Sequence, residues 1–338
     1  MTSAGPGVAE SARIAVLIPY FQREPGLLRR ALDSLAAQEH RPAQVVVIDD
    51  GSPCSAAEEI TPALHAVLGR LTVLRQANRG VAAARNAALD AVDDGVAAIA
   101  LLDSDDYWQS SHLRYAATAL AQGADFFFSN SRTEGAASDY FHGHPRCDLL
   151  FNSEPVAGAP QLRRWSEGAS ALFGAGCPFA TSAVVFRRAV MPELRFSTAF
   201  RRAAEDRKAC WDLVTRAAVI MFSTEPTLVS GTAGVGTWRK TGGSGADLVR
   251  LADELRWNRQ LIRSHLLRPP DRRLVRGAIS ARRQAALRSA LRLLIGRRNA
   301  HRELLYLLRS DPLCAPSWCF DLPRLLYRRI RKRSAATG

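Results

Sequence analysis

The sequence predicts an α/β fold in which helices flank a mostly parallel β-sheet, and three observations support this prediction. Short apolar runs alternate with segments of helical periodicity between residues 13 and 130. These runs are rich in consecutive Val, Ile, Leu and Ala residues, as are strands buried on both faces. Two of the runs end abruptly in acidic residues, at 49–50 and at 103–106. Open α/β sheets bind ligands at the carboxyl ends of their strands, so a site is expected there.

The first half of the chain is expected to alternate strictly between strands and helices. The expected strands are 13–21, 44–48, 71–75, 96–102 and 125–129, and the expected helices are 26–38, 56–68, 80–91 and 110–121. The helix at 26–38 shows the reasoning, because its leucines and alanines recur on one face at helical spacing.

The second half is less regular. Residues 130–160 are expected to form a long functional loop, because Gly, Ser and His interrupt the pattern. The expected elements that follow are a helix at 161–173, a strand at 182–187, a helix at 205–219, an extended segment at 220–229, a glycine-rich loop at 231–245 and a mainly helical region from 246 on.

Composition limits the class of protein. A chain of 338 residues with 47% hydrophobic residues can bury one large domain or two. It contains no run of about 18 apolar residues that would span a bilayer. Residues 1–12 are polar, contain Gly and Pro and lack a signal-peptide pattern, so we expect a disordered N-terminus and a cytoplasmic protein. The six cysteines form no CxxC pair, which argues against a zinc cluster or a disulfide framework.

The net charge of +14 is concentrated at one end of the chain. Residues 256–338 hold 21 Lys and Arg against 4 Asp and Glu, a net charge of +17, so the remainder is mildly acidic. The last quarter of the chain is therefore expected to behave as a separate region.

The run Leu101 to Trp108 contains the most informative acids. Asp103, Asp105 and Asp106 lie within four positions at the end of an apolar run, and three carboxylates there repel one another. A divalent cation would relieve the repulsion, and hard oxygen ligands suit Mg²⁺ or Mn²⁺. The alternative is a solvated Asp-rich turn that caps the helix beginning near Ser110.

Other residues at the same sheet edge fit a nucleoside diphosphate. Phe21 could form a wall for a base, and the Asp50 carboxylate could accept the N3–H of uracil. Arg85 and the helix that starts at Gly80 could bind a diphosphate. For single residues the simpler interpretations stand beside these: Arg85 pairs with an acid, and Phe21 is a core residue.

Four motifs together resemble family 2 glycosyltransferases of the GT-A fold. The family pattern of a strand ending IPxYN, then VxDDGSxD, NxGxxxARN and LDxDD, is matched by IPYFQ, VIDDGSP, NRGVAAARN and LDSDDYW. The resemblance covers residues 13–130 strongly and 180–215 more weakly. Within this family, the motif residues of this chain are most similar to those of the rhizobial succinoglycan-type exopolysaccharide glucosyltransferases. It departs from the pattern at Gln22, where Asn is usual, and at Pro53-Cys54, where an acid is common.

The resemblance implies a GT-A nucleotide-diphospho-sugar transferase domain at 13–245, with a donor half at 13–130 and an acceptor half at 131–245. The basic helical region then covers 246–338. In this interpretation Asp105 and Asp106 hold Mn²⁺ or Mg²⁺ on the diphosphate of a UDP-sugar. The expected residues of the donor site are Pro19, Phe21, Asp50, Asn78, Gly80, Arg85 and Asp103.

The resemblance also implies a catalytic base in the acceptor half. Family members carry it on an ED pair that begins a helix, and Glu205-Asp206 has that context, so Asp206 is the expected base. The alternative is that both acids only stabilise the first turn of a helix, where negative charge is favourable by about 0.3–1 kcal/mol.

The expected activity is that of an inverting, metal-dependent hexosyltransferase. It would move a sugar, expected to be glucose, to a hydroxyl of a polyprenyl-diphosphate-linked glycan in exopolysaccharide biosynthesis. Lipopolysaccharide or protein acceptors are the alternative within this class. A nucleotidyltransferase is disfavoured, because residues 20–24 lack the Gly-rich basic loop it would need.

The basic region suggests a membrane surface. Residues 287–309 and 322–333 interleave leucine with arginine, as expected for amphipathic helices on anionic lipid. We therefore expect a protein peripheral to the inner face of the plasma membrane. A nucleic-acid partner is not expected, because few aromatic residues lie among the basic ones. For residues 246–285, a helical bundle with a solvated Arg face is the alternative.

Overall fold

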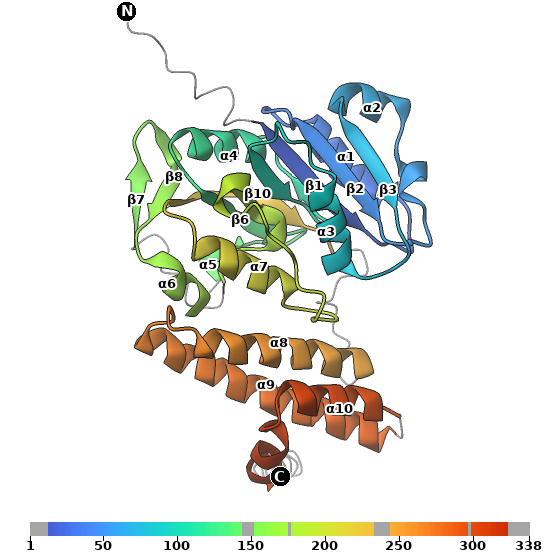
Figure 1. Ribbon diagram of the computed structural model, residues 1–338, viewed down its shortest axis with the longest axis vertical. Coiled ribbons are helices and arrows are strands. Elements are labelled where there is room, and N and C mark those ends of the chain that lie inside the picture. The colour runs from blue at the N-terminus through green and yellow to red at the C-terminus, as the bar shows by residue number, and fades with distance from the viewer. Residues whose placement is uncertain (1–12, 144–151, 175–176, 233–243, 297–298, 324–338) are drawn as a thin grey trace, which may run out of the picture. The chain divides into compact units, whose positions relative to one another are not determined.

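The computed structural model describes residues 13–143, 152–174, 177–232, 244–296 and 299–323 (Figure 1). The chain forms two compact units: one comprises Met1–Thr198 and Glu205–Gly236, and the other comprises Ala199–Ala204 and Thr237–Gly338. The N-terminus expected to be disordered, most of the glycine-rich loop and most of the segment 322–333 lie outside the described residues.

The first unit is built on one mixed sheet. Its strands are β1 (Ile14–Tyr20), β2 (Gln44–Asp49), β3 (Leu71–Arg75), β4 (Ala98–Leu101), β5 (Tyr107–Trp108), β6 (Phe126–Thr133), β7 (Ser153–Val156), β8 (Ala159–Trp165), β9 (Val184–Arg187) and β10 (Ile220–Ser230). Within the described residues the strand order is β3-β2-β1-β4-β9-β6-β10-β8-β7, and β5 pairs with β10. Of the strands in the described residues, only β5, β8 and β9 run against the others, so the predicted mostly parallel α/β fold is confirmed.

Helices cover both faces of this sheet. They are α1 (Leu27–Ala36), α2 (Pro62–Leu68), α3 (Val81–Asp90), α4 (His112–Ala121), α5 (Tyr140–Gly143), α6 (Gly168–Gly174) and α7 (Glu205–Val214), with 3₁₀ turns at Ala56–Glu59, Thr181–Ala183 and Arg188–Val190. Alternate residues of β1, including Val16 and Ile18, share one buried cluster with Leu32 of α1, Leu64 of α2 and Leu113 of α4. Figure 1 shows α3 and α7 over the opposite face.

The structure corrects the prediction in the second half of the chain. Residues 161–173 do not form one helix: β8 occupies 159–165 and α6 begins at Gly168. In β8 only Ala159, Leu162 and Trp165 are buried, and this spacing of three imitates a helix. The strand exists because β7 and β10 pair with it on either side.

Two predicted helices are also shorter or divided in the structure. The segment 56–68 is a 3₁₀ turn followed by α2, because Pro62 starts a new helix and the Thr61 side chain caps it by accepting the N–H of Leu64. The helix predicted at 205–219 ends at Val214.

The second unit consists mainly of helices α8 (Gly245–Arg263), α9 (Pro269–Ile295) and α10 (His301–Ser310). Leu251 and Leu255 of α8, Ile279 of α9 and Leu307 of α10 are buried. Buried acids bind several of its arginines: Asp311 pairs with Arg259 and Arg283, and Glu254 pairs with Arg250 and Arg282. Part of the positive charge of this region therefore stabilises the helices themselves.

Among the described residues, no helix combines the length and the apolar composition needed to cross a bilayer.

Candidate active site

Three neighbouring strands end at the same edge of the sheet. In the parallel pair β1–β2, Tyr20 lies opposite Asp49, and in the pair β1–β4, Leu17 lies opposite Leu101. The loops that follow β1, β2 and β4 therefore emerge together, and they carry the IPYFQ, DDGS and LDSDD motifs.

Asp50 is buried and joins the loop after β2 to the start of α3. One carboxylate oxygen accepts the Gln76 side-chain amide at 2.7 Å and the N–H of Arg79 at 2.9 Å, and the other accepts the N–H of Gly80 at 2.8 Å. The structure thus brings Asp50 and the NRG motif together. Of the three acceptor bonds, only one is to the second oxygen, so that oxygen can accept a further donor.

Gly51 has to be a glycine at this junction. Its φ is +67°, and a Cβ atom there would lie 2.9 Å from the backbone nitrogen of Asn78. The DDGS turn therefore packs directly on the loop before α3, and a side chain at this position would separate the two.

Gln22 connects the three loops, although the sequence marked it only as a departure from the family pattern. The backbone N–H of Gln22 donates to the Ser52 hydroxyl at 2.8 Å, and that hydroxyl donates to the Gln22 carbonyl at 2.7 Å. The side-chain amide of Gln22 donates to the Ser104 hydroxyl at 3.1 Å. All three residues are buried. The position of Gln22 directly after a strand was the available signal for this role.

The carboxylates that follow β4 affect one another's ionisation. The N–H of Asp103 donates to the Ser182 hydroxyl at 3.0 Å, and Asp106 accepts the N–H of Gly231 at 3.1 Å. Burial, together with the negative charges of Asp103 and Asp105, raises the pKa of Asp106 to about 7. Burial and the neighbouring carboxylates therefore both disfavour the ionised form of Asp106.

Arg30 of α1 holds the turn between β4 and β5 from outside the motif. Its guanidinium donates to the carbonyl of Asp105 at 3.1 Å and pairs with Glu134 at 3.0 Å. A Cβ atom on Gly231 would lie 2.1 Å from the same Asp105 carbonyl, so the chain after β10 lies directly against the acidic turn. Nothing in the helical pattern around Arg30 indicated this contact.

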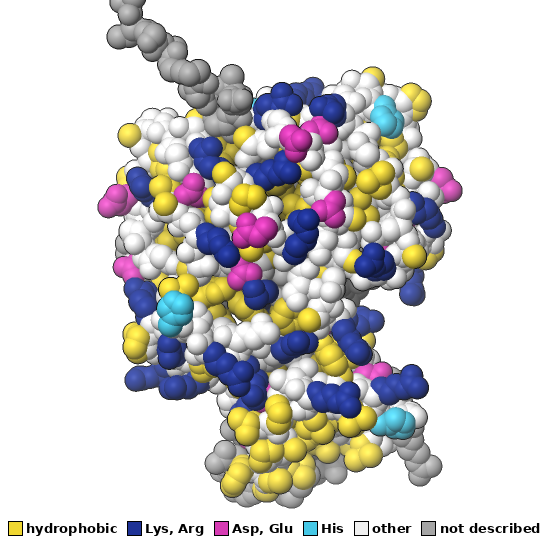
Figure 2. Space-filling view, in the orientation of Figure 1, with side chains coloured by type: hydrophobic (Ala, Val, Ile, Leu, Met, Phe, Trp, Pro, Cys, Tyr) yellow, Lys and Arg dark blue, Asp and Glu magenta, His cyan; other side chains and the backbone are white. Residues whose placement is uncertain are grey.

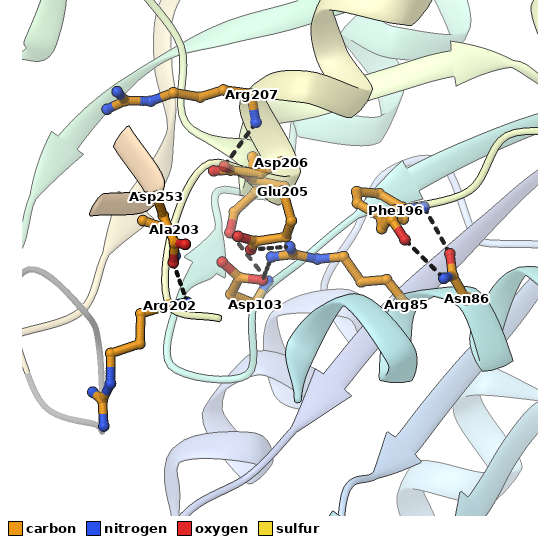
Figure 3. Close-up of polar contacts among 12 residues, drawn as sticks. Arg85, Asn86, Asp103, Phe196, Arg202, Ala203, Glu205, Asp206, Arg207 and Asp253 are labelled. Atoms are coloured by element: carbon orange, nitrogen blue, oxygen red, sulfur yellow. Dashed lines mark hydrogen bonds and ion pairs between the residues drawn. The ribbon is translucent and has the colours of Figure 1, made fainter. Parts of the chain in front are cut away.

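Arg85 of α3 bridges two motifs that are far apart in the sequence (Figure 3). Its side chain is 4% exposed, and it contacts Asp103 at 2.7 Å and Glu205 at 3.0 Å. Burial alone would lower the pKa of Arg85, but the charges of Asp103, Glu205 and Asp206 outweigh burial and raise it. In this structure its guanidinium serves two carboxylates, so the expected contact with a diphosphate stays a prediction.

The two acids at the start of α7 have different environments. Glu205 is buried, and burial with the charge of Asp206 raises its pKa to about 7 against the opposing effect of Arg85. Asp206 is partly exposed; it accepts the Thr181 hydroxyl at 2.8 Å and the N–H of Arg207 at 2.7 Å. Asp206 is thus the accessible carboxylate of the pair, held in one orientation by two donors.

The remaining predicted residues surround this edge. Pro19 is buried in β1, Phe21 is half-buried at its end, and Asn78 is exposed in the loop before α3. Gly80 is the N-terminal cap of α3 with a φ of 88°. Their roles toward a ligand remain predictions.

No group of three or more His, Cys, Asp or Glu side chains forms a complete metal cage in the described part of the chain. Mg²⁺ and related cations are commonly held by one or two carboxylates plus the phosphates of the substrate. Asp105 and Asp106 supply such oxygens, and a cation between them would offset the negative charges of Asp103 and Asp105 that, with burial, raise the pKa of Asp106. The residues present therefore fit a divalent cation that is shared with a diphosphate.

Comparison with known sequences gives the following relatives. Residues 15–190 match the pattern of the family described as Glycosyl transferase family 2. The chain is 35% identical over 196 residues to the succinoglycan biosynthesis protein ExoW of Rhizobium meliloti (strain 1021), covering 58% of this chain and 61% of ExoW. It is 29% identical over 133 residues to the glycosyltransferase GlyA of Streptococcus pneumoniae serotype 4, covering 38% of this chain and 18% of GlyA. The matches thus span less than two thirds of either relative.

Solved structures share the fold. Residues 1–349 of S. aureus TarS in complex with UDP-GlcNAc superpose with a TM-score of 0.53 at 16% identity, covering 91% of this chain and 92% of that chain. The mannosyltransferase PcManGT from Pyrobaculum calidifontis, in complex with GDP-Man and Mn²⁺, gives a TM-score of 0.54 at 17% identity, covering 91% and 82%. At these identities the likeness establishes the fold.

Proposed function

Because the chain belongs to glycosyl transferase family 2, we propose that it transfers a sugar from a nucleotide-sugar donor to a hydroxyl of an acceptor glycan. The predicted resemblance to rhizobial exopolysaccharide enzymes is confirmed by the similarity to ExoW. We extend this to a UDP-sugar donor, with glucose as the sugar, and to inversion at the anomeric carbon.

The contact of Arg85 with both Asp103 and Glu205 carries this proposal. A transferase must bring the donor and the base to the same anomeric carbon, since positioning supplies much of the rate. The bridge brings the LDSDD motif, the proposed donor side, together with the ED pair, the proposed acceptor side. If the acidic turn were only solvated, its carboxylate would not need to share a buried arginine with the start of α7.

On the donor side, we assign the uracil to the edge formed by β1 and β2. Phe21 is half-buried and offers an apolar wall beside Pro19, and Asp50 keeps an oxygen that can accept the N3–H of the base. Asn78 and Gly80 lie on the loop that Asp50 holds. Asp103 faces the ribose in this assignment, and Arg85 neutralises it.

Asp105 and Asp106 would hold Mn²⁺ or Mg²⁺ against the diphosphate. When bound, the cation would supply charge neutralisation for the departing nucleoside diphosphate. Arg30 and Gly231 hold in place the turn that carries these two carboxylates.

Asp206 acts as the general base in this proposal. It takes the proton of the acceptor hydroxyl as the oxygen attacks the anomeric carbon from the side opposite to the leaving group, which inverts the configuration. The Thr181 hydroxyl and the N–H of Arg207 orient its carboxylate. Glu205 is less suited to this role, because it is buried and paired with Arg85.

We assign the acceptor to a polyprenyl-diphosphate-linked glycan at an anionic membrane surface, on the cytoplasmic face. Residues 256–338 carry a net charge of +17. Large apolar side chains of the helical unit are exposed: Leu294 75%, Ile295 71%, Leu305 53%, Leu313 54% and Phe320 73%. Figure 2 shows hydrophobic side chains gathered on this unit. Exposed leucine among arginine is the composition that binds anionic lipid interfaces.

In this proposal residues 13–245 carry out catalysis and residues 246–338 contact the membrane. The arginines that pair with Glu254 and Asp311 are excepted, since they stabilise the bundle.

A UDP-release assay across UDP-sugars, with Mn²⁺, with Mg²⁺ and with EDTA, tests the activity and the metal together. Asp206→Asn keeps the size of the side chain but does not accept a proton at neutral pH. We expect its turnover to fall by about 10² to 10⁴ with UDP-sugar affinity unchanged. Collapse of donor affinity with normal turnover would show instead that Asp206 only caps α7.

A further inference from the structure

We propose that Ser182 is a positioning residue that sets the distance between the acidic turn (residues 103–106) and the proposed base Asp206. Ser182 lies in the 3₁₀ turn Thr181–Ala183, outside the four donor motifs and the ED pair. The inference rests on the proposed roles of the acidic turn and of Asp206. Every residue that carries it belongs to the first unit, which contains the sheet.

The direction of β9 brings the turn Thr181–Ala183 to the site. β9 pairs antiparallel with β4, and Val185 lies opposite Ala100. In an antiparallel pair the start of one strand lies beside the end of the other, so the chain enters β9 at the edge where β4 ends. The turn Thr181–Ala183 directly precedes β9, and the acidic turn follows β4. The two turns therefore meet at that edge.

Ser182 binds the acidic turn at both of its ends. The Ser182 hydroxyl accepts the N–H of Asp103 at 3.0 Å, and the Ser182 carbonyl accepts the indole N–H of Trp108 at 2.7 Å. Ser182 and Trp108 are both buried, and the Trp108 ring stacks on the buried ring of His112 with centroids 4.1 Å apart. The Ser182 side chain also hydrogen-bonds to Asp106, which opposes the effect of burial on the pKa of that carboxyl. One buried serine thus fixes the acidic turn from end to end.

Thr181, the residue before Ser182, binds the proposed base. Its hydroxyl donates to a carboxylate oxygen of Asp206 at 2.8 Å. The N–H of Ala183 donates to the carbonyl of Ala180 at 3.0 Å, which closes the turn between these attachment points. Two consecutive residues of one closed turn therefore hold the acidic turn and Asp206.

This connection is separate from the bridge that Arg85 makes. Arg85 joins Asp103 to Glu205 through side chains, whereas the turn Thr181–Ala183 joins the acidic turn to Asp206. Two connections between the same parts of the site restrict their orientation as well as their distance. Direct displacement requires the attacking hydroxyl and the departing diphosphate on opposite sides of the anomeric carbon, and a displacement of about 1 Å at a reacting group can cost about 100-fold.

Ser182→Ala should affect both sides of the site, because it deprives the Asp103 N–H of its acceptor. We expect faster amide hydrogen exchange in a peptide covering residues 102–108 of the ligand-free protein. The Mn²⁺ concentration that half-saturates UDP binding should rise about 10-fold, as is usual when the groups that orient metal-binding carboxylates are removed. At saturating Mn²⁺ and UDP-sugar, kcat should fall about 10- to 100-fold.

Thr181→Val should affect only the side of the base, because it removes the bond to Asp206 and none to the acidic turn. We expect a lower kcat, with the half-saturating Mn²⁺ concentration and the exchange of residues 102–108 unchanged. Thr181→Ser keeps the hydroxyl and should restore kcat. In the double variant of Ser182→Ala and Thr181→Val, kcat should be close to that of Ser182→Ala alone, since a loosened turn no longer orients Asp206 through Thr181.

Ser223 of β10 provides the matched control. It is also fully buried, and its hydroxyl accepts a backbone N–H, that of Glu225 at 3.2 Å, a residue with no assigned role in the site. Ser223→Ala should keep kcat within about twofold of the parent, because the loss of such a bond lowers stability without moving the site.

Three results would overturn the inference: normal kcat in Ser182→Ala, an equal loss of kcat in Ser223→Ala, or multiplicative losses in the double variant. If Ser182→Ala does not fold, Trp108→Phe replaces it, because it removes the indole donor to the Ser182 carbonyl; normal kcat in that variant would have the same meaning. Full turnover of the parent in EDTA would refute the proposed metal, and normal turnover in Asp206→Asn would refute the proposed base. Neither result alters amide exchange in the ligand-free protein, so these failures are distinguishable.

Discussion

Replacing Arg85 with Met tests the electrostatic centre of the site. The side chains of Arg85 and Glu205 are 4% and 9% exposed, so solvent screens this pair little, whereas Asp103 is 35% exposed and can be solvated if its partner is lost. Breaking a buried pair by removing one partner costs about 3–5 kcal/mol, because the other charge stays buried. The pKa of Glu205 is raised to about 7, so this carboxylate is fully ionised only at alkaline pH; at about pH 9 we expect Arg85→Met to lower the free energy of unfolding by about 3–5 kcal/mol, mainly through Glu205.

A double-mutant cycle identifies the cause. Glu205→Gln removes the charge that Arg85→Met would leave unpaired, so the double variant should recover about 2 kcal/mol or more relative to the sum of the single variants. Urea unfolding at about pH 9, where the Glu205 carboxylate is ionised, measures all four proteins. A loss below about 1 kcal/mol for Arg85→Met, or additive losses in the double variant, would refute the assignment.

Three further predictions concern the metal, a buried histidine and the tail. Asp105→Ala should abolish turnover and remove the effect of Mn²⁺ on UDP affinity, while the melting temperature stays unchanged; turnover at the parent rate in EDTA would contradict this. Burial lowers the pKa of His112 to about 3, so below about pH 6.5 the unfolded chain binds a proton that the native state does not, and stability falls as the pH falls. Between pH 7 and pH 5 this amounts to about 2 kcal/mol, which should vanish from the pH dependence of urea unfolding in His112→Phe. Deleting residues 322–338 removes six of the 21 basic residues of the last quarter and should weaken sedimentation with anionic vesicles while UDP-sugar hydrolysis by water continues; undiminished, salt-insensitive vesicle binding would exclude a membrane role for this segment.

Local patterns in the sequence predicted most of the strands and helices of residues 13–130. The strand predicted at 71–75 has those bounds in the structure, and the apolar spacing in 26–38 predicted the buried face of α1. This works because a strand buried on both faces and an amphipathic helix each have a periodicity that neighbouring residues alone determine. The acidic ends of two strands likewise predicted which edge of the sheet holds the candidate site.

The sequence pattern gave a wrong prediction where strand pairing, and not residue periodicity, decides the local structure. The buried residues of β8 recur every third position, and only its two neighbouring strands decide that the segment is extended. Gln22 shows a related limit: its bonds to the DDGS and LDSDD loops depend on three loops meeting in space, while the sequence showed only an unusual residue.

For the charged residues, too, the sequence and the tertiary structure supplied different information. The sequence by itself predicted that Asp103, Asp105, Asp106, Glu205 and Asp206 occupy motif positions of a family 2 glycosyltransferase. Only the tertiary structure decided that Arg85 bridges two of these motifs and that Ser182 binds both ends of the acidic turn. Such contacts join residues 18 to 120 positions apart. A side chain's partners depend on which surfaces the packed core brings together, a property that no local spacing encodes.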